Sequence, residues 1–213
     1  MSLCARWGDK RVLFLMAAEP EYGAMLRARI TPVMTGVGPV EGGVATAATL
    51  AELAAGAGLP DLVVSLGSAG SARLDQARVY QASHLAYRDM DASALGFARG
   101  VTPFLDLPAV VPLAPLLPWV PQASLSTGAN IVSGADYAGI AEDMVDMESF
   151  AVLRACQRFK VPLVVLRGIS DGAAPLEGLE DWTAYLDVVD ARLAEVLDGL
   201  RQELEAGRVR TAG

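Results

Sequence analysis

Carboxylates are the side chains of this chain that stand where chemistry is usually done. Glu148 opens a helical pattern of apolar residues, Asp171 ends an apolar run typical of a buried strand, and Glu21 follows another such run. Ligands of open α/β sheets bind outside the carboxyl ends of the strands, where a carboxylate can serve as acid, base or hydroxyl acceptor. Each residue could equally be a turn residue or a helix cap, which is the common role of an acidic residue after a strand.

Other catalytic chemistries have weaker candidates. The chain has one histidine, His84, inside a strand-like run, where a packing or surface role is favoured over catalysis. No G-x-S-x-G pattern accompanies it. Cys4 and Cys156 have no metal-binding spacing, so we expect no metal site. The glycines at 36–38 lack the third glycine of a dinucleotide fingerprint and no Walker pattern occurs, so we expect no cofactor.

The elements that must position the carboxylates alternate between strands and helices. Apolar runs predict strands at 12–18, 30–35, 61–66, 79–87, 123–127, around 144 and at 161–170. Helices are predicted before residue 29, after the glycine-rich turn at 36–43, from Phe150, and as one long amphipathic helix over 182–204. This alternation predicts an α/β fold with a mostly parallel sheet, and the absence of a linker suits a single domain over 1–213.

The composition of the chain limits the kinds of molecule that it is expected to bind. The chain is 53% hydrophobic and 20% charged, which is enough apolar material for a large core. Its net charge of −8 argues against nucleic acid or an anionic membrane as the main partner. No signal pattern opens the chain and no apolar run reaches about 18 residues, so we expect a cytoplasmic protein without a membrane span.

Four motifs in order give the chain a family resemblance. They are TGVGPVEGG (35–43), VVSLGSAG (63–70), VDMES (145–149) and LRGISD (166–171). This series resembles the nucleoside phosphorylase and nucleosidase superfamily, and within it most of all the 5'-methylthioadenosine/S-adenosylhomocysteine nucleosidases. The resemblance implies a three-layer αβα fold around a mostly parallel, twisted mixed sheet. It also implies cofactor-free hydrolysis of a purine nucleoside and a role in methionine salvage. The apolar, proline-rich loop at 88–121 and the small size of the chain favour a homodimer.

The resemblance also implies roles for single residues. Asp171 matches the general acid at N7 of the leaving purine, and Glu148 matches the carboxylate that binds the ribose hydroxyls, with Met147 under the sugar. Glu21 matches the acid that positions the attacking water, and Glu19 is a rival for that role. The remaining matches are Ser68 and Gly70 beside the base and water, Ser170, Arg167 as the residue that helps set the position of Asp171, and Ile131 and Val132 in the base loop.

The nucleophile is expected to be water. Phosphorylases of the superfamily carry arginines around the first and second loops, whereas residues 17–21 are acidic here and residues 64–66 include no arginine. A phosphate dianion beside Glu19 and Glu21 would be repelled. Arg27 and Arg29 are possible anion contacts, although helix-surface roles are favoured. The alternatives are a phosphorylase, a nucleosidase for another purine compound such as futalosine, and a nucleoside-binding relative without turnover.

Two departures from the family pattern concern the substrate. In the base loop, Ile131 stands where the family has an aromatic residue, so stacking on the base would need another ring. In the segment before the expected pocket for the 5'-substituent, Arg88 replaces a histidine. Phe97, Phe104 and Leu105 could line that pocket across a dimer interface, or simply pack under a long loop.

Overall fold

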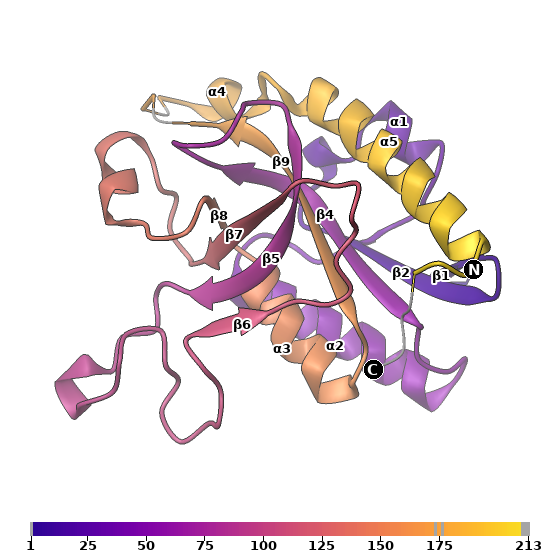
Figure 1. Ribbon diagram of the computed structural model, residues 1–213, viewed down its shortest axis with the longest axis horizontal. Helices are drawn as coiled ribbons and strands as arrows, with labels where there is room; N and C mark the ends of the chain where they lie inside the picture. The colour runs from indigo at the N-terminus through magenta and orange to yellow at the C-terminus, as the bar shows by residue number, and fades with distance from the viewer. Residues whose placement is uncertain (1, 173, 176, 210–213) are drawn as a thin grey trace.

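The computed structural model describes residues 2–172, 174–175 and 177–209. Nine strands form one mixed sheet with helices around it (Figure 1). The strands are β1 (Cys4–Trp7), β2 (Lys10–Met16), β3 (Val33–Met34), β4 (Leu62–Gly70), β5 (Val79–Tyr87), β6 (Val110–Pro112), β7 (Gln122–Thr127), β8 (Met144–Asp146) and β9 (Leu163–Asp171). The α-helices are α1 (Ala24–Arg27), α2 (Pro39–Ala55), α3 (Ser149–Phe159), α4 (Leu179–Thr183) and α5 (Leu186–Glu205); the 3₁₀ helices are η1 (Glu19–Glu21), η2 (Ser93–Leu95) and η3 (Gly134–Gly139).

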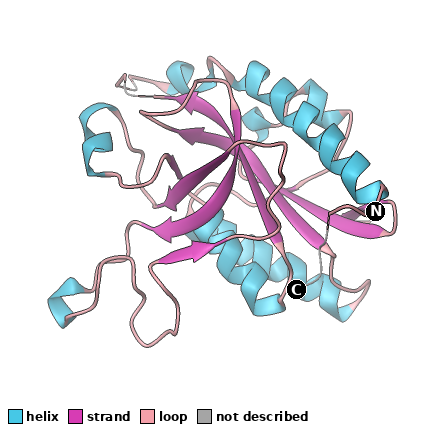
Figure 2. Cartoon of the chain, viewed as in Figure 1, coloured by secondary structure: helices cyan, strands magenta, loops and turns pink. Residues whose placement is uncertain are grey.

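Helices cover both faces of the sheet, as Figure 2 shows. Helices α2 and α3 lie together on one face, where Leu50 and Phe150 belong to a buried apolar cluster. Helices α1 and α5 lie on the other face, where Leu26 and Leu193 belong to a second cluster. Each face buries its own apolar core, which confirms the predicted three-layer αβα fold.

The strands pair in a way that the apolar runs did not predict. Strand β4 pairs in parallel with β2 and β9, β9 pairs with β5, β5 with β7, and β7 with β8. Strand β8 then returns to β4 through the pair Gly70–Val145. Five strands therefore form a closed ring of pairings, and the ring closes at the carboxyl ends of β4 and β8. Because these ends meet, residues far apart in the chain lie together there.

Several element boundaries differ from the predictions. Strand β4 continues through the turn expected at 67–70, because small residues there pair with β9 up to Asp171. The strand expected at 30–35 shrinks to the two residues of β3. The long C-terminal helix is divided, since α4 ends at Thr183 and α5 begins at Leu186. No helix in the described part of the chain is both long and apolar enough to cross a bilayer.

Candidate active site

Three acidic residues meet at the carboxyl edge formed by β2, β4 and β9. Glu21 lies in η1 just after β2, and Asp171 is the last residue of β9. Glu148 follows β8 and is the N-cap residue of α3. Strands β2, β4 and β9 run parallel and in register, so Glu21 and Asp171 reach one edge although they are distant in sequence. Glu148 comes to the same edge because β8 meets the end of β4 in an antiparallel pair, Gly70 with Val145.

Glu21 is held inside the protein by Ser68. Its Oε1 accepts hydrogen bonds from the Ser68 backbone N–H at 2.7 Å and from Ser68 Oγ at 2.6 Å. A Cβ at position 67 would lie 3.1 Å from both carboxylate oxygens, so Gly67 provides the space for them. Burial raises the pKa of Glu21, although the Ser68 hydrogen bonds oppose the rise. Glu19 instead points outward and pairs with Arg27 at 2.8 Å, so the geometry favours Glu21 over its rival.

Glu148 connects the glycine-rich turn to α3. Its Oε1 accepts a hydrogen bond from the Gly38 N–H at 2.8 Å, which leaves Oε2 for another donor. A Cβ on Gly42 would lie 3.1 Å from the Glu148 Cβ, so α2 and α3 approach closely at this point. Burial, with the charge of Asp146 nearby, raises the pKa of Glu148 to about 7. The half-buried Met147 directly precedes it.

Arg167, expected to help set the position of Asp171, makes its hydrogen bonds with other residues. Its guanidinium donates to Asp146 Oδ2 from Nε at 3.2 Å and from Nη2 at 3.0 Å, and to Ser149 Oγ at 2.8 Å and Ser65 Oγ at 3.1 Å. The pair with Asp146 is almost wholly buried. A buried guanidinium needs a buried anion, and Asp146 on β8 supplies it. Burial raises the pKa of both Glu21 and Glu148, and the positive charge of Arg167 opposes that rise in each. The electrostatic effect of Arg167 therefore falls on these two carboxylates.

Asp171 is held by a donor on each carboxylate oxygen. Ser170 Oγ donates to Oδ1 at 2.7 Å, and the Tyr137 hydroxyl donates to Oδ2 at 3.2 Å. Gly70 lies against the same carboxylate, since a Cβ there would be 2.7 Å from Oδ2. Burial raises the pKa of Asp171, while the two hydroxyl donors lower it. A carboxyl group with a raised pKa is suited to hold a proton near neutral pH.

The structure separates the two residues predicted for the base loop. Val132 is buried and clusters with Tyr137 and Val145. Ile131 has 67% of its surface exposed and takes no part in that cluster. Tyr137 therefore provides an aromatic ring next to Asp171, near the base loop in which Ile131 replaces the aromatic residue of the family.

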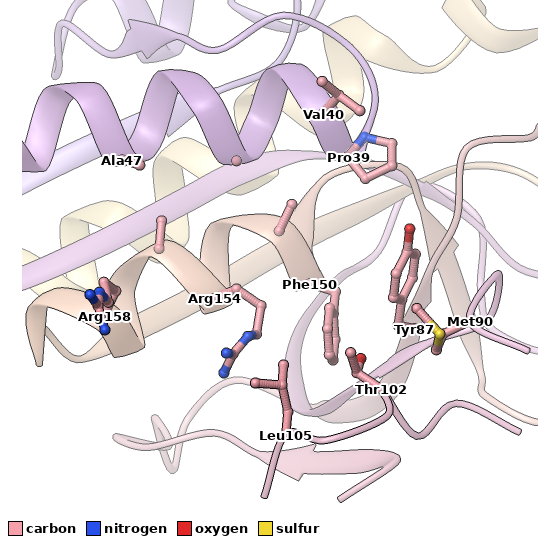
Figure 3. Close-up of a pocket in the computed structure, with 13 residues that line it drawn as sticks. Pro39, Val40, Ala47, Tyr87, Met90, Thr102, Leu105, Phe150, Arg154 and Arg158 are labelled. Carbon is pink, nitrogen blue, oxygen red and sulfur yellow. The ribbon is translucent and has the colours of Figure 1, made fainter. Parts of the chain in front are cut away.

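An open, mostly apolar pocket of about 570 Å³ lies between α2, α3 and the chain after β5 (Figure 3). The rings of Tyr87 and Phe150 stack on each other in its wall, with centroids 5.3 Å apart. Leu105, one of the three residues considered for the pocket of the 5'-substituent, lines this pocket. Phe97 and Phe104 do not; they pack edge-on against each other, and Phe104 is 93% exposed. Phe150, in the pocket wall, lies two residues after Glu148, although Glu148 itself does not line the pocket.

Comparison with known proteins finds relatives of the part of the chain that holds Glu148 and Asp171. Residues 124–200, from β7 to α5, match the model of the phosphorylase superfamily. The 5'-methylthioadenosine/S-adenosylhomocysteine nucleosidase of Actinobacillus succinogenes is 29% identical over 164 residues, which are 68% of this chain and 71% of that protein. The chain is thus similar to the phosphorylase superfamily over residues 124–200 and to a curated nucleosidase over about two thirds of its length.

Solved structures share the fold of this protein along nearly the whole chain. The 5'-methylthioadenosine/S-adenosylhomocysteine nucleosidase of Colwellia psychrerythraea, in complex with adenine, superposes with a TM-score of 0.75 at 22% identity. The match covers 95% of this chain and 96% of that one. A futalosine hydrolase mutant of Helicobacter pylori gives a TM-score of 0.74 at 19% identity, with 90% and 98% covered. At these identities the likeness establishes the fold.

Three residues of this candidate site could not be identified from the sequence patterns. Tyr137 lies in a segment to which no periodicity assigned an element. Trp182 was expected in a long helix, but its Nε1 donates to Ser68 Oγ at 3.0 Å, so α4 covers the Glu21 side of the site. The sequence pattern indicated only that Asp146 ends a strand, and gave no sign that it pairs with Arg167. Within the described ranges, no cluster of three metal-ligating side chains occurs.

Proposed function

We propose that this protein is a purine nucleosidase that hydrolyses the N-glycosidic bond of 5'-methylthioadenosine, S-adenosylhomocysteine or a related 5'-modified nucleoside. The observation that carries the proposal is the group formed by Glu21, Glu148 and Asp171 at one sheet edge. Each carboxylate lies against a glycine that leaves space for it, and burial raises the pKa of each. The similarity to curated nucleosidases supports the same activity.

In this reaction, water adds to C1' of the sugar while the bond from C1' to the purine nitrogen breaks. The transition state resembles an oxocarbenium ion, which nearby carboxylates stabilise. Asp171 gives its proton to N7, so the base leaves as a neutral molecule. Glu21, fixed by Ser68, orients the water and takes its proton. Glu148 binds the ribose hydroxyls through the oxygen that Gly38 leaves free.

The surroundings of Glu21 favour water over phosphate. Arg27 is paired with Glu19, and Arg29 donates to Asp198 on α5 at 2.8 Å. Both arginines thus hold surface carboxylates, in agreement with the surface roles favoured from the sequence. Arg167 is already neutralised by Asp146. A phosphate dianion would therefore meet Glu21 without a free cation in the described part of the chain beside it.

The test is incubation with 5'-methylthioadenosine, S-adenosylhomocysteine and futalosine in phosphate-free buffer, with the released base measured by chromatography. We expect adenine from the first two without added phosphate, and a loss of release in Glu21→Gln. Glu19→Gln is the matched control and should retain activity, because its side chain points away from the site. Release that depends strictly on phosphate, or no release at high enzyme concentration, would reject the proposal.

We also propose that the protein is a cytoplasmic homodimer in which a second copy covers the outer side of the pocket between α2, α3 and the chain after β5. Val37, Val40 and Val44 lie next to this pocket, and between 56% and 70% of each is exposed. Exposed apolar patches rimmed by polar residues are typical of interaction surfaces, and these three valines would supply one. Two copies would close the open pocket from outside and shield a 5'-substituent from water.

A further inference from the structure

Tyr137 contacts the proposed acid but has no place in the reaction described above. It lies on η3, and its hydroxyl donates to Asp171 Oδ2 at 3.2 Å. Its ring is buried with Val132 and Val145, which belong to the base loop and to β8. The tyrosine therefore connects the loop expected to hold the base with the residue expected to protonate it.

The space for this contact is provided by Gly70. A Cβ at that position would lie 2.2 Å from the Tyr137 hydroxyl oxygen and 2.7 Å from Asp171 Oδ2, closer than any real Cβ approaches such atoms. Gly70 is also the residue through which β4 pairs with β8 and closes the ring of strands. Gly70 thus contacts both Tyr137 and Asp171 at the place where β4 pairs with β8. A side chain at position 70 would push the tyrosine away from the aspartate.

The hydrogen-bonding direction of Tyr137 is fixed by its partner. An ionised carboxylate has only acceptors, so the hydroxyl must give its proton to Asp171 and keeps its own oxygen lone pairs free. When Asp171 is protonated for catalysis, its proton points to the base, and its other oxygen still accepts from Tyr137. Burial, together with the charge of Asp171, raises the pKa of Tyr137, while Arg88 opposes the rise. The phenol therefore stays protonated and offers an acceptor to the site.

On the basis of the proposed function, we propose that Tyr137 is a specificity-determining residue that accepts a hydrogen bond from the 6-amino group of the purine. N7 and the 6-substituent are neighbours on the same edge of a purine, so a group beside Asp171 faces the 6-position when Asp171 faces N7. A 6-amino group can donate to the phenol oxygen. A 6-oxo group would face that oxygen with no proton between them, which is unfavourable in a buried site.

The test compares 5'-methylthioadenosine with its 6-oxo counterpart, 5'-methylthioinosine, in the wild type and in Tyr137→Phe. Removing the hydroxyl should lower kcat/KM for the 6-amino substrate by roughly five- to tenfold and change the 6-oxo substrate little. The ratio of the two values isolates the contact, because any change in the pKa of Asp171 affects both substrates alike. Tyr185→Phe, an exposed tyrosine before α5, is the control and should leave the ratio unchanged.

An equal loss for both substrates would mean that Tyr137 only packs, and would overturn the inference. If no nucleoside is cleaved, the proposed function fails, but Tyr137 can still be tested with the free bases. Binding of adenine and of hypoxanthine is then measured by calorimetry. A five- to tenfold weaker binding of adenine alone by Tyr137→Phe would support the inference. Unchanged binding of adenine would reject it.

Discussion

Asp171 has one hydroxyl donor on each oxygen, and its replacement by asparagine tests its role with little change of shape. The asparagine side chain would keep an acceptor but could not deliver a proton, so we expect Asp171→Asn to lower kcat by about 10²- to 10⁴-fold. The thermal unfolding curve should stay close to that of the wild type. Asp75→Asn, an exposed residue paired with Arg78, is the control. Turnover retained by Asp171→Asn would remove this residue from the proposed mechanism.

Glu148 makes the stability of the protein depend on pH. Its pKa is about 7 in the folded chain, compared with 4.5 for a glutamate in the unfolded chain, so folding favours the protonated form. Its contribution to stability is full below about pH 4.5 and is lost as the pH rises through about 7. Glu148→Gln, which keeps the acceptor for Gly38, should therefore be more stable than the wild type at pH 8, by about 1–3 kcal/mol.

This difference should fade toward pH 5, and urea unfolding at the two pH values measures it. Glu52→Gln, an exposed position on α2, serves as the control, and its stability difference from the wild type should not change between the two pH values. A constant offset between wild type and Glu148→Gln at all pH values would contradict the prediction.

At the scale of elements, α2 and α3 determine where Glu148 lies, and two adjacent glycines test this. A Cβ on Gly42 would press on the Glu148 side chain at 3.1 Å, whereas one on Gly43 would meet Ala151 at 3.4 Å, an ordinary contact. Gly42→Ala should displace the carboxylate and raise KM about tenfold, roughly the loss of one hydrogen bond to a charged group. Gly43→Ala should leave KM unchanged and add up to about 1 kcal/mol of stability through helix propensity. Equal KM values for the two variants would count against this placement.

Elements with strong apolar patterns could be predicted from the sequence, and weakly patterned ones could not. Strand β5 has the expected bounds, because its apolar residues are bounded by turn-formers. Strand β6 has three residues within a proline-rich stretch and is too short to show a period. The positions of Glu21 and Asp171 at one edge follow from parallel strands, whereas that of Glu148 depends on the antiparallel meeting of β8 with β4. The partners of Arg167 and Tyr137 depend on the return of β8 to β4, which leaves no periodicity in the sequence.

At the scale of the whole molecule, the proposed homodimer can be tested on α2. Val40→Asp would bury an unpaired charge in the interface. The free-energy cost of removing that charge from water exceeds the free energy that the contact contributes, so the dimer should dissociate. Light scattering during gel filtration should give about twice the chain mass of 22.3 kDa for the wild type and one chain mass for the variant. Val188→Asp on α5, at the opposite face, is the control and should remain dimeric. A monomeric wild type would reject the dimer.

The closed ring of β4, β9, β5, β7 and β8 also bears on how the molecule opens. Each of these strands has a partner on both sides at some point along its length, so none can detach without breaking a neighbouring ladder. Backbone amides inside the ring should exchange with deuterium only when the whole chain unfolds, whereas those of β1 and β6 at the sheet ends should exchange through local opening. The single pair Gly70–Val145 is the narrowest part of the ring. Amide exchange rates there would reveal whether substrate entry begins with the parting of β4 and β8.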